Sequence, residues 1–252
     1  MSVRTEILGS SLLITIDRPQ ARNAVDAAVA RGIAAAIDQL EADPNLRVGV
    51  LTGAEGTFSA GMDLKAALKG ESPEIDGRGF GGLTETQTTK PLIAAVEGFA
   101  MGGGFELALA CDLIVAAEDA QFGLPEVKRG LVAAGGGVIR LPQRIPHHLA
   151  MEFLLTGEPV TGARAAELGL VNRVVAPGEA AAVALQLAER LTANAPLALA
   201  AVKKIVTAAH GVPEADAFEA QRKEMAQLMG SADVREGMQA FAERRQPVWT
   251  GR

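Results

Sequence analysis

The 252-residue sequence contains one cysteine, Cys111, and no tyrosine. A single thiol forms no disulfide within the chain, which favours a reducing compartment, and the lack of tyrosine excludes any step that needs a phenol. The longest apolar region, 92–117, is interrupted by Glu97, Glu106 and Asp112, so no run reaches the ~18 uncharged residues of a membrane-spanning helix. The sequence also lacks the basic stretch, apolar run and cleavage site of a secretory signal. We therefore expect a cytoplasmic protein.

Charge and composition restrict the partners that we expect. The chain has 24 Lys and Arg residues against 30 Asp and Glu residues, and the net charge of −6 argues against nucleic acid or an anionic membrane surface as a partner. An anionic small ligand is not excluded. With 48% hydrophobic residues the sequence is typical of a globular protein, and its length suits one or two domains whose core needs no disulfide or metal.

Hydrophobic periodicity predicts alternating strands and helices in the first half of the chain. Apolar residues recur every three or four positions after Asn23, which predicts an amphipathic helix over 24–40. Short apolar runs bounded by turn residues or charge predict strands, the first two in a hairpin: 3–8, 12–16, 48–51, 92–96 and 113–115. Residues 66–90 are rich in glycine, threonine and charge, and we interpret them as a mobile surface segment.

Helices dominate the second half of the chain. Only 171–175 keeps a strand pattern, whereas helical periodicity covers four segments: 180–191, 197–209, 214–229 and 234–244. Pro196 and Pro213 stand near the starts of two of these helices, where proline is favoured. The predicted fold class is therefore α/β, with a core over 1–195 and a helical region over 196–252.

A run of three glycines, 102–104, follows a buried strand and precedes an apolar helix. Backbone N–H groups at such a helix start have no intrahelical partner, which predicts a cradle for an anion or oxyanion. A dinucleotide fingerprint would need a third glycine where Leu107 stands, and no phosphate-loop motif follows. Ala60-Gly61 is a second site of close backbone approach, although an ordinary turn into a helix that starts at Asp63 explains the same residues.

Two glutamates are candidates for acid–base chemistry. Glu106 lies three residues after Gly103, where capping glutamates are common, and Glu126 follows a proline in a short loop, where a solvated carboxylate is common. The chain between them is long enough to return to the same side of a sheet, so together they also suit a general acid and base. Two carboxyls buried together do not both ionise easily, and their pKa values belong to the pair.

The remaining reactive side chains do not predict a metal or nucleophile site. His147 and His148 are neighbours near a helix start and face different ways, which argues against a shared metal ion. Cys111 lies in an apolar stretch and is interpreted as a small core residue. We therefore expect no bound metal.

Four ordered segments resemble the signature segments of the crotonase superfamily, the enoyl-CoA hydratase/isomerase family. They are FSAGMDL at 58–64, GFAMGGGFELA at 98–108, CD at 111–112 and FGLPE at 122–126. The similarity extends over nearly the whole chain, from IDRP at 16–19 to the final helices. It implies the crotonase fold, a ββα spiral core with a helical C-terminal region that mediates trimerisation.

The resemblance also implies the residues that do the chemistry. Enzymes of this superfamily hold the carbonyl oxygen of an acyl-CoA thioester between two backbone N–H groups, which by motif position are those of Met62 and Gly103. One such donor is typically worth about 2.7–4 kcal/mol of barrier. The hydratases carry two glutamates at the positions of Glu106 and Glu126, so Glu106 is expected to deprotonate the water and Glu126 to handle the proton at Cα.

For the CoA moiety the resemblance implies contacts from two segments, one before and one within the first signature: Gln20, Ala21, Arg22, Ala60, Asp63, Leu64 and Lys65. Arg244 or Arg245 is a further candidate for the nucleotide, although each basic residue taken singly also fits a solvated surface charge. Residues 130–137, GLVAAGGG, depart from the proline and glycines that many relatives have there, which leaves the acyl preference open.

The function that the resemblance implies is an enoyl-CoA hydratase, a lyase that needs no metal or redox cofactor and assembles as a homotrimer or homohexamer. Carnitinyl-CoA dehydratases, which use paired glutamates on a charged substrate, are the nearest alternative. An isomerase needs only one of the two glutamates, which argues against it. A non-catalytic acyl-CoA-binding protein on the same fold is the alternative from another class.

Overall fold

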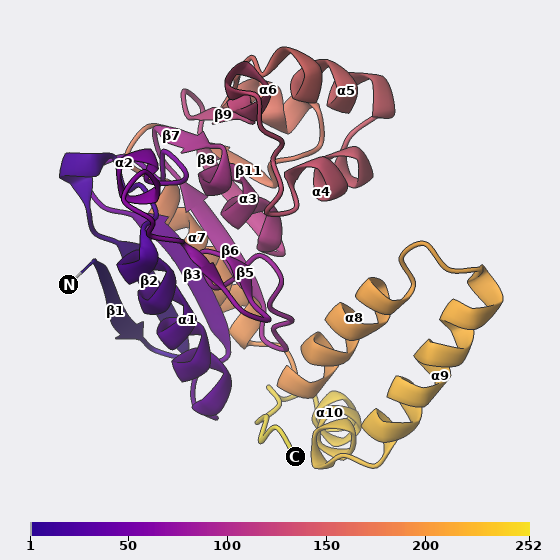
Figure 1. Ribbon diagram of the computed structural model, residues 1–252. Coiled ribbons are helices and arrows are strands. Elements are labelled where there is room, and N and C mark those ends of the chain that lie inside the picture. The colour runs from indigo at the N-terminus through magenta and orange to yellow at the C-terminus, as the bar shows by residue number, and fades with distance from the viewer. Residues whose placement is uncertain (1) are drawn as a thin grey trace.

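The computed structural model describes residues 2–252 as a six-stranded sheet with helices on both faces, and the last three helices project away from it (Figure 1). The strand order is β1-β2-β3-β6-β8-β11, in which β1 is antiparallel to β2 and all other pairs are parallel. The strands are β1 (Val3–Leu8), β2 (Ser11–Ile16), β3 (Val48–Gly53), β6 (Leu92–Val96), β8 (Leu113–Ala117) and β11 (Arg173–Val175). The predicted α/β class is confirmed.

The central strands are buried on both faces because a helix covers each of them. Side chains of a strand point alternately to its two faces, so Val48 and Val50 of β3 pack against α7 (Ala180–Thr192). Every fourth residue of α7 on this side is an alanine, which lets the helix lie close to the sheet: Ala180, Ala184 and Ala188. Leu51 points to the other face and joins the core under α1 (Ala27–Ala42). The two faces therefore hold two separate apolar clusters.

Helix α1 begins three residues later than the periodicity predicts. The carboxylate of Asp26 accepts a hydrogen bond from the N–H of Val29 at 2.9 Å, which makes Asp26 the N-cap and Ala27 the first helical residue. Residues 23–25 are therefore free to form an irregular turn, and Val25 bridges to Met62 in the first signature segment. The sequence pattern missed this boundary because the apolar spacing continues across it.

A second, three-stranded sheet has the order β10-β9-β7. Its strands are short, and the sequence pattern did not reveal them: β7 (Phe99–Met101), β9 (Gln121–Gly123) and β10 (Val160–Thr161). Strand β7 follows β6 closely and leads directly into α3 (Gly103–Ala110), so the glycine run lies where the two sheets meet the helix (Figure 1).

The interpretation of 66–90 as a surface segment is wrong for part of its length. The segment holds the end of α2 (Leu64–Ala67) and a hairpin of β4 (Glu74–Ile75) and β5 (Gly79–Phe80), and residues 79–84 are buried. Phe80 and Leu83 supply the apolar contacts, with 5% and 2% of their surface exposed. Two isolated apolar residues among glycines and polar residues give no period, which is why the sequence did not reveal the burial.

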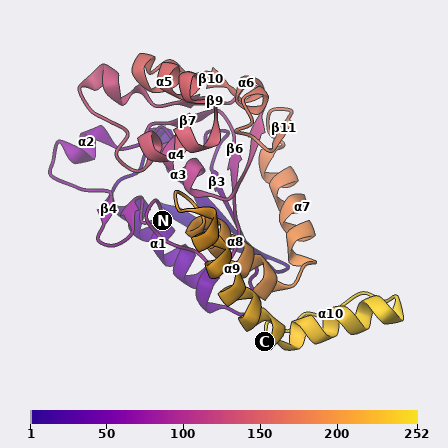
Figure 2. The ribbon, with the colours of Figure 1, turned by 90° about the vertical axis from the view of Figure 1, so that its right-hand side faces the viewer.

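The remaining helices surround the second sheet or form the C-terminal region (Figure 2). They are η1 (Pro19–Ala21), η2 (Pro125–Arg129), α4 (Gly137–Arg144), α5 (His147–Thr156), α6 (Gly162–Glu167), α8 (Pro196–Ala208), α9 (Glu214–Met229) and α10 (Ala232–Glu243). Among them, the helix predicted over 214–229 has the predicted bounds. The final residues return to the end of α7, where the indole of Trp249 donates to the carbonyl of Ala193 at 2.7 Å. Among residues 2–252, no helix has the length and apolar character needed to cross a membrane.

Candidate active site

The candidate site forms where the turn at 59–62 approaches β7 and the start of α3. The N–H of Ser59 donates to the carbonyl of Phe99 at 2.7 Å, and the N–H of Met101 donates to the carbonyl of Ser59 at 3.0 Å. A Cβ at Gly61 would lie 2.5 Å from the carbonyl oxygen of Met101. A Cβ at Gly104 would overlap the carbonyl oxygen of Ser59. Glycine at both positions therefore permits an approach that any other residue would prevent.

Buried polar side chains hold the turn at 59–62 in place. Asn23 is fully buried, and its amide donates to the carbonyls of Ala54 and Thr57 at 2.9 and 2.5 Å. The hydroxyl of Ser59 donates to the carbonyl of Asn23 at 2.9 Å and accepts from the N–H of Gly61 at 3.1 Å. These bonds satisfy buried groups that would otherwise carry a desolvation cost, so the turn has one favoured arrangement.

Asp63 supports the same turn from its other end. Its carboxylate pairs with Arg18 at 3.0 Å and accepts from the N–H groups of Lys65 and Ala66 at the start of α2, both at 3.1 Å. Burial raises the pKa of this carboxyl, but the Ala66 N–H and the Arg18 guanidinium outweigh burial and leave the pKa lowered. The structure thus gives Asp63 a helix-capping role, and its predicted contact with CoA stays a prediction.

Met62 and Gly103 line one cavity of about 320 Å³. Within residues 2–252 neither of their backbone N–H groups donates to a protein acceptor. Gly103 is the first residue of α3, where an N–H has no intrahelical partner. Both donors are therefore available to an oxygen atom in the cavity.

The cavity gathers about half of the predicted site residues. Its lining contains six of them, Arg22, Ala60, Met62, Leu64, Gly103 and Glu126, together with Phe99, Met101, Gly102, Pro125, Arg129 and Leu131. Glu106 and the predicted CoA contacts Gln20, Ala21, Asp63 and Lys65 do not line it. The guanidinium of Arg22 lies 5.8 Å from the centre of the Phe99 ring, which fixes one wall of the cavity.

Glu106 does not cap its own helix. Gly102 is the N-cap of α3, and the Glu106 carboxylate instead accepts a hydrogen bond from the N–H of Gly137, at the start of α4, at 2.8 Å. Only 3% of the residue's surface is exposed. Burial this deep excludes a solvated surface carboxylate and makes Glu106 a candidate for acid–base chemistry.

Burial raises the pKa of Glu106 to about 7. The N–H groups of Gly137 and Gly135 act in the opposite direction, while the nearby carboxylates of Glu126 and Glu74 add to the increase. A Cβ at Gly135 would lie 2.8 Å from one Glu106 oxygen, and a Cβ at Gly137 would lie 3.1 Å from the other. The glycines after Ala134 therefore make room for this carboxyl as well as hydrogen bonding to it.

Glu126 lies beside Gly102, at the start of the glycine run. A Cβ at Gly102 would lie 2.8 Å from its Oε1, while Oε2 is buried and has no hydrogen-bond partner in the described part of the chain. Burial raises the pKa of Glu126, although its own N–H and the Arg129 guanidinium reduce the increase. A buried carboxyl oxygen without a partner is costly unless a ligand or water completes it.

Several residues of the site carry no signal in the sequence analysis. The ring of Phe80 packs against the backbone of Gly103, where any Cβ would overlap it. The guanidinium of Arg140 donates to the carbonyls of Gly135, at 3.3 Å, and of Thr84. The sequence contained one indication of this region: the glycine run at 135–137, which departs from the family pattern.

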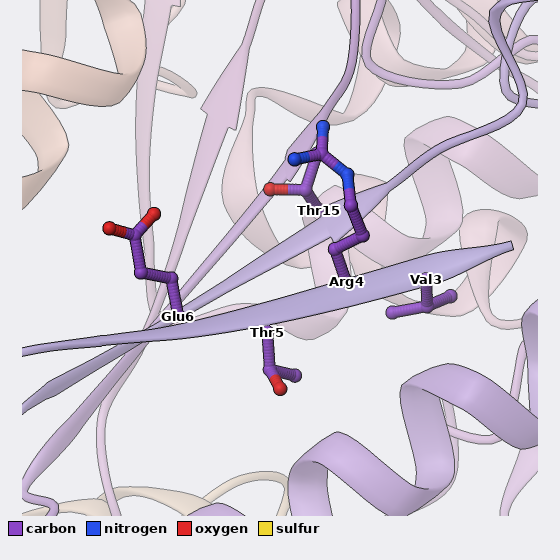
Figure 3. A pocket seen from close by; sticks show the side chains of 5 residues that line it. All are labelled: Val3, Arg4, Thr5, Glu6 and Thr15. Atoms are coloured by element: carbon purple, nitrogen blue, oxygen red, sulfur yellow. The ribbon is translucent and has the colours of Figure 1, made fainter. Parts of the chain in front are cut away.

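A second hollow, of about 430 Å³, lies on β1 and β2 and is lined by Val3, Arg4, Thr5, Glu6 and Thr15 (Figure 3). Figure 3 shows that Arg4 and Glu6 project from one face of β1, whereas Val3 and Thr5 project from the other. No set of reactive groups converges there, and we do not assign it a function. In the part of the chain that the structure describes, no three His, Cys, Asp or Glu side chains cluster closely enough to hold a metal ion.

Comparisons with known proteins identify the family and the fold. The sequence model of the family described as "Enoyl-CoA hydratase/isomerase" matches residues 6–252. A solved structure of enoyl-CoA hydratase from Mycobacterium tuberculosis H37Rv is 55% identical, covers 100% of this chain and 99% of its own, and superposes with a TM-score of 0.97. The crotonase fold predicted from the motifs is therefore confirmed.

Other relatives have a different name. "Carnitinyl-CoA dehydratase" from Salmonella enteritidis PT4 is 47% identical over an alignment of 252 positions that covers 97% of this chain and 96% of that protein. A crystal structure of carnitinyl-CoA hydratase from Mycobacterium avium is also 47% identical, with a TM-score of 0.80 and coverage of 100% of this chain and 99% of that one.

Replacing Glu106 by glutamine is expected to stabilise the protein above about pH 7. Because burial raises the pKa from 4.5 to about 7, ionisation of Glu106 opposes folding. This cost is absent below pH 4.5, increases as the pH rises and is complete above about pH 7, where it reaches roughly 3 kcal/mol. Urea unfolding of the wild type and Glu106→Gln at pH 5 and pH 8 measures it.

The exposed helix residue Glu219 provides the control, since Glu219→Gln should change the free energy of unfolding equally little at both pH values. A Glu106→Gln variant that is no more stable than the wild type at pH 8 would contradict the raised pKa.

Proposed function

We propose that this chain, which belongs to the enoyl-CoA hydratase/isomerase family of the crotonase superfamily, adds water reversibly and in the syn sense across the 2,3-double bond of a 2-enoyl-CoA. The observation that carries the proposal is one cavity lined by the free N–H groups of Met62 and Gly103 and by Glu126, together with a second carboxyl, Glu106, close enough for Glu126 to raise its pKa. A proton donor, a proton acceptor and an oxyanion site are what hydration of an unsaturated thioester requires.

The thioester oxygen is proposed to accept hydrogen bonds from Met62 and Gly103. These N–H groups are fixed by the backbone, so they need no rearrangement as negative charge develops on the oxygen. Each is worth about 2.7–4 kcal/mol of barrier at this kind of site. Polarisation of the thioester also withdraws electrons from Cβ, which makes that carbon susceptible to attack by water.

The two glutamates are proposed to share one proton at neutral pH. In the form of the pair in which Glu126 holds the shared proton, ionised Glu106 takes a proton from the water as the water oxygen bonds to Cβ, and Glu126 gives its proton to Cα. Transfer of the proton from Glu106 back to Glu126 through solvent restores the starting state, so the reaction consumes only water. The mutual effect of the carboxylates favours one proton on the pair, because two adjacent charges in a buried site are costly.

The proposed CoA contacts rest on the same family membership. We propose that Arg22, Ala60 and Leu64, which line the cavity, contact the CoA moiety, and that Gln20, Ala21, Asp63 and Lys65 lie along its path. No separate cofactor, a homotrimer or homohexamer, a cytoplasmic location and a distinct helical region over 196–252 complete the proposal.

A second candidate is a carnitinyl-CoA dehydratase. An acidic pair near the site, Glu74 and Glu85, favours it. Glu74 is the cross-strand neighbour of Phe80, so both side chains lie on one face of the hairpin, and the Phe80 ring packs on Gly103. Burial and the nearby Glu85 raise the pKa of Glu74, and its charge also acts on Glu106. Carboxylates beside the acyl group would favour a cationic substrate. The carnitinyl group in the name of the carnitinyl-CoA dehydratase relatives is such a cation.

Turnover of crotonyl-CoA tests the two-glutamate mechanism. We expect the wild type to remove the absorbance of the conjugated thioester, and Glu106→Gln and Glu126→Gln each to lose at least about 100-fold in kcat, since each deletes one proton transfer. Both variants should still bind crotonyl-CoA. Full activity in either variant would contradict the mechanism, and tight binding without turnover by the wild type would instead support the acyl-CoA-binding alternative.

A matched pair of substrates tests the second candidate. The comparison uses crotonyl-CoA and crotonobetainyl-CoA, which differ by a trimethylammonium group on the acyl chain. If the acidic pair recognises this cation, Glu74→Gln should lower kcat/KM for the cationic substrate by about two- to fivefold and leave crotonyl-CoA unchanged. The exposed Glu71→Gln is the control. Equal effects on both substrates would count against a carnitinyl specificity.

A further inference from the structure

Arg140 of α4 is partly buried beside the candidate site, and it braces two backbone segments. One guanidinium nitrogen, Nη1, donates to the carbonyl of Gly135 at 3.3 Å, and the other, Nη2, donates to the carbonyl of Thr84. No carboxylate forms an ion pair with it anywhere in residues 2–252. Buried arginines usually pair with a carboxylate. The Arg140 guanidinium instead donates its hydrogen bonds to main-chain carbonyls.

The first braced segment is the turn that holds Glu106. Gly137 donates its N–H to the Glu106 carboxylate at 2.8 Å, and a Cβ at Gly135 would lie 2.8 Å from the other carboxylate oxygen. Gly136 lies between them with φ of +107°, and a Cβ there would overlap the Arg140 guanidinium. The turn therefore contacts Glu106 on one side and Arg140 on the other.

The second braced segment, 79–84, packs against the start of α3. Thr84 follows the buried residues 79–83, whose Phe80 ring packs on Gly103 and whose Phe80 Cβ lies close to Gly135. By joining Thr84 to Gly135, Arg140 ties the hairpin segment to the α4 turn. Without Arg140, the two segments would contact each other only through apolar groups. Apolar contacts are not directional, so they would fix the spacing of the segments but not their relative orientation.

We propose that Arg140 is a positioning residue: its two hydrogen bonds hold the Gly135–Gly137 turn and the 79–84 segment in the arrangement that orients the Glu106 carboxylate toward the substrate. The inference rests on the proposed hydratase function for its kinetic consequence. Its structural core, the coupling between Arg140 and Glu106 through the turn, is independent of the substrate.

The ionisation of Glu106 reports on this arrangement. The charged groups that act on it are Glu126 from η2, Glu74 from β4 and Arg140 from α4. Loss of the Arg140 brace removes a positive charge and loosens the N–H donors that stabilise the carboxylate, and both effects disfavour its ionised form. A variant without the guanidinium should therefore need a higher pH to ionise Glu106.

The kinetic test compares Arg140→Gln and Arg140→Lys with Arg144→Gln in hydration of crotonyl-CoA by the full chain between pH 5.5 and 9. Arg144 is exposed on the same helix, so its replacement changes net charge equally without touching the turn. We expect Arg140→Gln to lower kcat about 10- to 100-fold, change KM less than about threefold, and move the acidic limb of the kcat profile to higher pH. Lysine should restore activity only in part, because it lacks the planar fork that reaches two carbonyls.

The proposal would be overturned by an acidic limb in folded Arg140→Lys and Arg140→Gln that coincides with the wild type, or by an equal shift in Arg144→Gln. A loss that appears in KM alone would also overturn it, since that result would place Arg140 in substrate binding.

A second measurement separates this proposal from the proposed function. Unfolding midpoints of the wild type, Glu106→Gln, Arg140→Gln and the double variant are measured at pH 5.5 and pH 8. The stabilisation that Glu106→Gln confers at pH 8 should be larger in the Arg140→Gln background, because the ionised carboxylate has lost support there. Equal stabilisation in both backgrounds would overturn the proposal even if the protein hydrates no enoyl-CoA; if Arg140→Gln does not fold, Arg140→Lys replaces it in the same comparison.

Discussion

Contact between two backbone turns, one at 59–62 and one at 102–104, determines the geometry of everything around it. Glycine at 61 and 104 leaves room for the carbonyl oxygens of Met101 and Ser59, which occupy the space where side chains would stand. This contact places the N–H groups of Met62 and Gly103 at one cavity, with no protein acceptor among the described residues. Because the donors are backbone groups, their positions depend on the fold and not on side-chain rotamers.

Around that contact, the chain reconciles two opposing demands on Glu106. The catalytic role proposed for Glu106 calls for a buried carboxylate, yet burial disfavours the ionised form that accepts a proton. The structure offsets part of the burial with N–H groups from the turn at 135–137, which leaves the pKa at about 7, where proposed proton transfer is most effective. Glycines in this turn bring the N–H groups close enough, and Arg140 orients the turn from its other side.

The sequence predicted the elements whose patterns are local and strong. Strand 92–96 and helix 214–229 have the predicted bounds, because an unbroken apolar run and a long periodic segment each depend on their own residues. The buried segment 79–84 could not be predicted, since Phe80 and Leu83 pack against distant parts of the chain and form no period. The short strands β7, β9 and β10 were missed because two or three residues carry too little pattern.

The same distinction applies to the candidate site. Met62, Gly103 and Glu126 belong to motifs, and the structure brings them to one cavity. The partner of Glu106 could not be inferred from its position three residues after Gly103, which favoured capping of its own helix. That carboxylate instead bonds to Gly137, 31 positions away, and only tertiary structure places the two together. Arg140 gave no signal for the same reason, because its partners are main-chain carbonyls that any sequence provides.

The central claim is that the backbone N–H groups of Met62 and Gly103 bind the thioester oxygen. Butyryl-CoA labelled with ¹³C at the thioester carbonyl has no double bond to hydrate, so its complex with the wild type can be studied at equilibrium. Isotope-edited infrared difference spectroscopy measures the carbonyl stretch directly. Two hydrogen bonds to the oxygen predict a stretch at lower wavenumber in the bound state than in water. A saturated complex whose carbonyl stretch matches that of free butyryl-CoA would contradict the account.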